Sequence, residues 1–60
     1  MSEKMIRRIL AIYEQSVKDH APGGKHFKYY QFIFDTADAH RRHEVAKQRL
    51  AKFKLRHNLM

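Results

Sequence analysis

Cysteine and tryptophan are missing from this 60-residue chain, which contains only one proline and two glycines. Without cysteine, neither a disulfide nor a thiolate zinc site can stabilise the fold. A chain of this size buries only about 60% of the surface that it exposes when unfolded, so a single hydrophobic core is marginal. We therefore expect one domain over residues 1–60 that gains stability by self-association.

Long apolar runs are also missing. Charged residues interrupt the first apolar stretch, MSEKMIRRILAIYEQ, whereas a secretory signal needs an unbroken apolar core of about 7–15 residues. No segment approaches the roughly 20 apolar residues of a membrane span. Together with the absence of cysteine, these features predict a cytoplasmic protein that does not bind membranes.

Motifs for catalysis or cofactor binding are a third absence. The chain contains no nucleophile elbow, no HExxH zinc motif and no complete glycine-rich phosphate loop. His40 and His43 lie one helical turn apart, but a stable zinc site needs three or four ligands. We therefore expect a protein that is not an enzyme and that holds neither a cofactor nor a metal.

The proline and both glycines lie together in Ala21-Pro22-Gly23-Gly24, which predicts a turn over residues 20–25. Before this turn, Ser2 is a candidate N-cap, and apolar residues spaced three and four apart predict a helix over residues 2–19. After it, residues 26–57 contain no glycine or proline and predict one long helix. The expected fold is therefore an all-α helical hairpin.

A joint in the second helix near residues 35–38 is the alternative. Asp35 or Thr36 could act as a new N-cap, which would give helices over 2–19, 26–34 and 37–57. Three short helices ending in a basic one are the outline of a helix-turn-helix domain. One apolar stripe, from Phe27 to Ala37, changes face near residues 37–41, which favours the joint. A second stripe, from Tyr29 onward, runs unbroken through this region, so we favour the hairpin.

This second stripe is the predicted dimer or partner interface, because its residues alternate three and four apart as in a coiled-coil seam. In a hairpin the first helix is about 25 Å long and the second about 45 Å. The last third of the second helix would then extend beyond its partner and expose apolar surface, which usually marks an interface. We expect a homodimer that forms a helical bundle. The candidate interface residues are Tyr29, Phe32, Ala46, Leu50 and Phe53.

Positive charge is the most pronounced property of the chain. Thirteen basic residues against six acidic ones give a formal net charge of +7, and residues 38–60 alone carry seven bases and two acids. Bases gathered on one element are typical of a nucleic-acid binder, although a solvated helix face has the same composition. Five of them lie within about 100° of one another on a helix. They are Arg41, Arg42, Arg49, Lys52 and Arg56.

These five residues predict contacts with the phosphates of DNA or RNA, because arginine pairs bidentately with phosphate. The chain is then a small nucleic-acid-binding accessory or regulatory factor. The alternative is an adaptor or inhibitor that docks its basic or aromatic helical face on an acidic protein partner. The mixture of bases and aromatic residues over 25–32 is typical of single-strand binders, but core positions explain it better.

Overall fold

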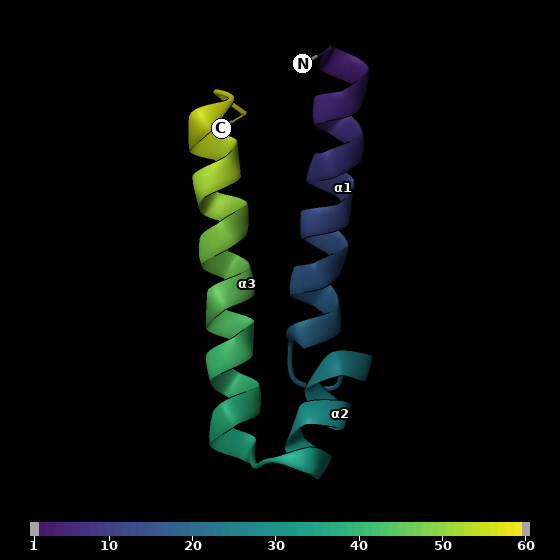
Figure 1. The fold of residues 1–60 in the computed structure, drawn as a ribbon, viewed down its shortest axis with the longest axis vertical. Coiled ribbons are helices and arrows are strands. Elements are labelled where there is room, and N and C mark those ends of the chain that lie inside the picture. Colours follow the sequence, from purple (N-terminus) through teal and green to yellow (C-terminus); the bar gives the residue numbers. More distant parts are fainter. Residues whose placement is uncertain (1, 60) are drawn as a thin grey trace.

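The computed structural model of the chain describes residues 2–59, which form three α-helices and no strand (Figure 1). They are α1 (Glu3–His20), α2 (Lys25–Ile33) and α3 (Thr36–Arg56). The helices α1 and α2 follow each other along one side of an elongated molecule, and α3 runs back along the other side (Figure 1). The predicted all-α class is confirmed. Within residues 2–59, no helix is both long and apolar enough to cross a membrane.

Side-chain and backbone caps explain where α1 begins and ends. The Ser2 hydroxyl accepts a hydrogen bond from the backbone N–H of Met5 at 3.2 Å, as predicted for an N-cap. At the other end, Ala21 has an extended backbone, and its N–H donates to the carbonyl of Val17 at 3.0 Å. The helix therefore begins and ends within a residue or two of the predicted bounds.

The turn over residues 21–24 depends on its two glycines for different reasons. Gly23 has a φ of +88°, which lies in the left-handed region that glycine adopts without steric cost. Gly24 has an ordinary φ, but a Cβ atom on it would lie 2.3 Å from the backbone oxygen of Asp19. The end of α1 and the start of α2 can therefore approach this closely only because residue 24 has no side chain.

The predicted long helix over 26–57 is wrong, and the three-helix alternative is correct. The chain leaves the helical conformation at Phe34, and Asp35 is extended, with φ −161° and ψ 176°. The Oδ1 atom of Asp35 accepts a 2.7 Å hydrogen bond from the N–H of Asp38, which makes Asp35 the N-cap of α3. This cap satisfies one of the N–H groups that the start of a new helix leaves unpaired, so the break needs no glycine.

The place where the chain reverses also differs from the prediction. The reversal occurs between α2 and α3, so α3 lies against both α1 and α2 instead of extending beyond a shorter partner (Figure 1). Near the C-terminal end of α3, the ring of Phe53 packs on that of Tyr13 in α1, with centroids 5.2 Å apart. Ala46, Leu50 and Phe53 of this stripe are thus buried or half-buried within the chain, and the described part of α3 does not extend beyond α1. This antiparallel arrangement also differs from the crossed helices of a helix-turn-helix domain.

The core of the described residues is small. Only Phe27, Ala39 and Ala46 are buried, and no large side chain is completely enclosed. Aromatic pairs join each helix to the next: besides Tyr13 and Phe53, the rings of Phe27 and His40 connect α2 with α3, and those of His20 and His26 connect α1 with α2. Alanine at the buried positions of α3 lets the other helices approach its backbone closely.

Candidate anion-binding groove

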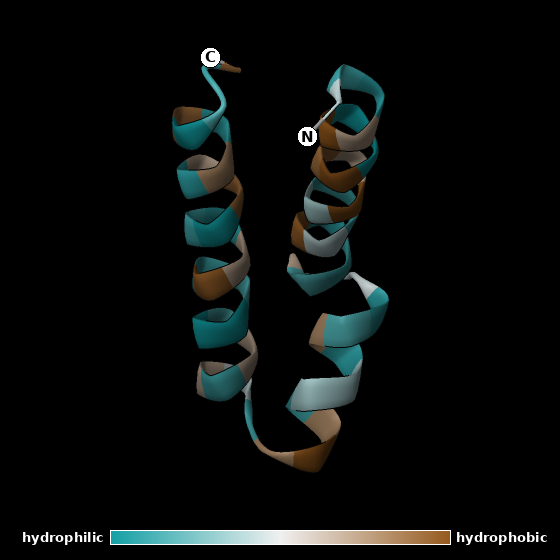
Figure 2. Cartoon of the chain, turned by 45° about the horizontal axis from the view of Figure 1, so that its top comes forward, coloured by the Kyte–Doolittle hydropathy of each residue, from teal (hydrophilic) through white to brown (hydrophobic). Residues whose placement is uncertain are grey.

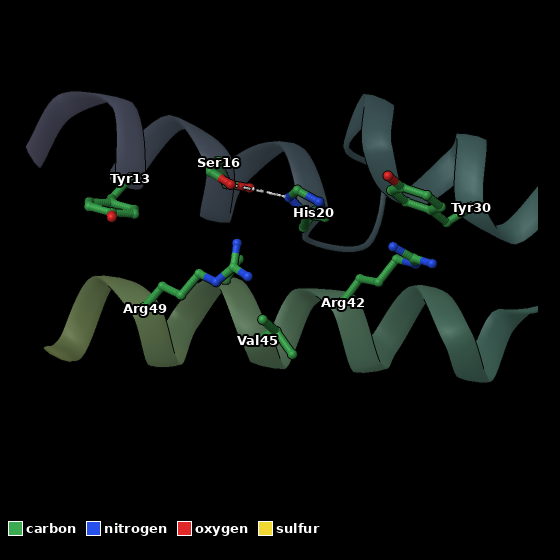
Figure 3. A pocket seen from close by; sticks show the side chains of 8 residues that line it. Tyr13, Ser16, His20, Tyr30, Arg42, Val45 and Arg49 are labelled. Carbon is green, nitrogen blue, oxygen red and sulfur yellow. Dashed lines mark hydrogen bonds between the residues drawn. The ribbon is translucent and has the colours of Figure 1, made fainter. Parts of the chain in front are cut away.

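A groove runs between α3 and the column formed by α1 and α2. It consists of two hollows, of about 300 Å³ and about 160 Å³, that share Tyr13 and Arg49. None of the described residues that line either hollow is acidic. The polar residues of the larger hollow are Tyr13, Ser16, His20, Tyr30, Arg42 and Arg49 (Figure 3). Lys52, Phe53 and Arg56 complete the smaller one.

The register of α3 places its cations in a row along this groove. Arg42, Arg49 and Arg56 are seven residues apart, so they lie within about 40° of one another on the helix surface. At a rise of 1.5 Å per residue, the row is about 20 Å long. Lys52 lies between the last two arginines. Four of the five basic residues predicted from the sequence therefore line one continuous groove.

Arg42 is held in place by two neighbours. Its Nε donates a 2.7 Å hydrogen bond to Asp38, and its guanidinium carbon lies 4.0 Å from the centroid of the Tyr30 ring. The hydrogen bond to Asp38 raises the pKa of Arg42 above its ordinary value, with a smaller contribution from Tyr30. Because this charge is shared with a carboxylate, Arg42 attracts an anion less strongly than an unpaired arginine does.

Arg49, Lys52 and Arg56 carry charges that no described acidic side chain compensates. The ion pairs of residues 2–59 involve other cations, and all three side chains are exposed. The side chain of Arg49 extends from α3 toward Ser16 and His20 (Figure 3). These three residues therefore make the groove an attractive site for an extended anion.

Arg41 is the one predicted basic residue that lies outside the groove. It lines neither hollow, its side chain is 72% exposed, and its Nη1 lies 3.6 Å from an oxygen of Asp38. On α3 it lies about 100° around the helix from Arg42 and eight residues before Arg49. Arg41 consequently serves as a comparison residue, with the same chemistry in a different place.

The five predicted interface residues occupy two separate places. Ala46 is buried, while Leu50 and Phe53 are half-buried on the side of α3 that contacts α1. Tyr29 and Phe32 are exposed on α2, with Phe32 at 88% of its full accessible surface. The predicted interface residues of α3 are therefore packed within the same chain, whereas the two residues of α2 remain exposed.

Sequence reasoning did not identify the groove residues of α1. Tyr13, Ser16 and His20 belong to no recognised binding motif. Their spacing of three and four places all three on one helix face, which is a signal that could have grouped them. That face becomes part of the groove only because α3 packs beside it.

His20 has a defined orientation in the groove. Its Nδ1 lies 2.7 Å from the backbone oxygen of Ser16 and 3.4 Å from the Ser16 hydroxyl. A carbonyl oxygen can only accept, so Nδ1 carries the hydrogen and donates it. This leaves Nε2 of His20 available to a ligand. The His20 ring is also nearly parallel to that of Tyr30, with centroids 6.1 Å apart.

Among residues 2–59, no three histidine, aspartate or glutamate side chains are grouped as they would be around a metal ion. Comparison of the chain with protein-family models, with curated proteins and with solved structures found no match. The geometry of the groove is therefore the basis for an interpretation of function.

Proposed function

We propose that this protein is a small, non-enzymatic nucleic-acid-binding factor of accessory or regulatory type, and that it binds the phosphates of a strand in the α1–α3 groove. The observation that carries the proposal is the row of Arg49, Lys52 and Arg56, whose charges no described acid compensates. With Arg42 the cation row is about 20 Å long, which suits a polyanion with regularly spaced charges.

The composition of the groove supports a nucleic acid over an acidic protein. Arginine binds phosphate bidentately, and tyrosine offers both a ring face for a base or sugar and a hydroxyl for a phosphate oxygen. The groove combines these groups, with Tyr13 and Tyr30 beside the arginines. A protein partner can use such rings as well, so the regular row of cations is what favours a nucleic acid.

The test is binding of a labelled oligonucleotide, measured by fluorescence anisotropy over a range of salt concentrations. Four phosphate contacts predict a log–log salt slope of about −3 to −4. The double variant Arg49→Glu/Arg56→Glu should weaken binding by about a hundredfold or more, because two attractive contacts become repulsive. Arg41→Glu is the matched control for the single variant Arg49→Glu, since each reverses one charge and only Arg41 lies outside the groove.

Two results would contradict the proposal. One is binding by the double variant that equals wild-type binding while both fold alike by circular dichroism. The other is a loss of affinity with Arg41→Glu as large as the loss with Arg49→Glu. Such a result would indicate that net charge alone drives binding, wherever the charge lies. Capture of a single acidic protein at fixed stoichiometry, unaffected by nuclease, would favour the adaptor or inhibitor function instead.

We further propose that the protein forms a homodimer. The support is a cluster of exposed apolar side chains at the end of the molecule where α2 meets α3, which is strongly hydrophobic in Figure 2. This apolar tip consists of Tyr29, Phe32, Ile33 and Phe34. The small core of a chain without disulfides is a second support. A cytoplasmic location belongs to the same proposal, because the chain contains no cysteine.

Light scattering tests the dimer directly. Wild-type protein should have twice the mass of one chain, and Phe32→Asp should reduce this to a single mass without loss of helicity, because a charge in the apolar tip opposes its burial. Leu50→Asp should also lower stability, since Leu50 is half-buried on α3. A monomeric wild-type protein would refute the dimer.

A further inference from the structure

The larger hollow of the groove is closed at one end and open at the other. At the closed end, Arg42 of α3 lies against the ring of Tyr30 of α2, so the two sides of the groove are in contact there (Figure 3). At the other end, the hollow continues through Tyr13 and Arg49 into the smaller one beside Lys52 and Arg56. A strand that follows the cation row toward α2 meets this contact, so the hollow is suited to the end of a strand.

The size and chemistry of the larger hollow suit the last nucleotide of a strand. Its volume of about 300 Å³ is far more than a phosphate group alone needs and lies at the lower limit of ordinary ligand sites. The rings of His20 and Tyr30 lie nearly parallel and add aromatic surface to its wall. Val45 and Ala46 add an apolar wall between the polar groups.

The polar groups around this hollow suit a doubly charged phosphate. Arg49 brings an uncompensated charge, and Arg42 adds one that Asp38 partly balances. The Ser16 hydroxyl can donate a hydrogen bond to a phosphate oxygen, and the protonated His20 ring donates a second one from Nε2. A terminal phosphate monoester carries about −1.5 to −2 charges and three acceptor oxygens, whereas an internal phosphodiester carries one charge. The site therefore favours the monoester.

We propose that the hollow bounded by Ser16, His20, Arg42 and Arg49 receives the terminal nucleotide of a nucleic-acid strand, with its terminal phosphate monoester on Arg49. This inference rests on the nucleic-acid binding proposed above and makes it specific for strand ends. The rest of the strand leaves the hollow past Arg49 and continues along Lys52 and Arg56. The contact of Arg42 with Tyr30 is the argument for an end over the middle of a strand, and the experiment distinguishes a 5′ end from a 3′ end.

The test compares three forms of one short single-stranded oligonucleotide: one with a 5′ phosphate, one with a 3′ phosphate and one with hydroxyls at both ends. Wild-type protein should bind one phosphorylated form about tenfold more tightly than the hydroxyl form, as expected for added charge-assisted hydrogen bonds. Ser16→Ala and His20→Ala should reduce the ratio between the affinities for the phosphorylated and the hydroxyl form, with both affinities measured on the same variant. Arg41→Ala should preserve the preference.

The outcomes separate the two proposals. Equal binding of all three forms would overturn the strand-end site and leave nucleic-acid binding in place. Absence of binding to any form would overturn the proposed function itself. A preference that survives unchanged in folded His20→Ala and Ser16→Ala proteins would also overturn the site, because it would place the terminal phosphate elsewhere. The comparison on wild-type protein needs no variant, so misfolding of a variant does not affect it.

Discussion

The guanidinium carbon of Arg42 lies 4.0 Å from the centroid of the Tyr30 ring, and this contact connects α3 with α2 across the groove. On its other side, Arg42 donates a 2.7 Å hydrogen bond to Asp38, three residues after the N-cap of α3. The same side chain thus contributes to the packing of the helices, to the start of α3 and to the closed end of the groove.

Arg42→Ala should lower the melting temperature by several degrees, because it removes both the contact with Tyr30 and the hydrogen bond to Asp38. Arg41→Ala is the control, since Arg41 is 72% exposed and lies 3.6 Å from the same carboxylate. Circular dichroism melts of the two variants measure the difference. Equal melting temperatures would show that the Arg42–Tyr30 contact does not stabilise the fold.

Asp35→Ala should destabilise the fold by about 1 kcal/mol, because it removes the side-chain oxygen that accepts from the Asp38 N–H at the start of α3. Asp35→Asn retains an oxygen at this position and should have a much smaller effect. Urea denaturation of both variants provides the measurement. If Asn and Ala are equally destabilising, the carboxylate acts through its charge and the cap is not the cause.

The two glycines of the α1–α2 turn should respond differently to alanine. At Gly24 a methyl group would lie 2.3 Å from a backbone oxygen, so Gly24→Ala should cost more than about 2 kcal/mol. Around Gly23 there is open space, and Gly23→Ala should cost only the strain of its positive φ, about 1 kcal/mol. Denaturant melts should show this order, and the reverse order would contradict the described packing of α1 against α2.

Enlarging a buried alanine of α3 should separate the helices. Ala39 is 1% exposed, and Ala39→Leu should destabilise the protein by about 1–3 kcal/mol through overpacking. Ala51→Leu makes the same change at an exposed position of α3 and should alter stability by no more than about 0.5 kcal/mol. Equal stabilities of the two variants would place Ala39 at the surface.

Local signals in the sequence were sufficient for the helices themselves. Ser2, the Pro-Gly-Gly turn and Asp35 mark the ends of helices, because a cap or a turn acts within a few residues of its own position. The choice between two helices and three was nevertheless wrong. The apolar stripe from Tyr29 onward keeps its spacing of three and four residues across the break between α2 and α3. Such a spacing does not require one continuous helix.

By itself, the sequence determined an all-α chain with a basic last helix, and it placed Arg42, Arg49, Lys52 and Arg56 on one side of that helix. These properties depend on composition and on helical periodicity, which are local. Only the tertiary structure decided that the chain reverses at residues 34–35 and that α1 lies beside α3. The contact of Tyr30 with Arg42 and the position of His20 in the groove follow from that packing. Interactions between residues far apart in the sequence determine this packing, and no short segment of the sequence encodes these interactions.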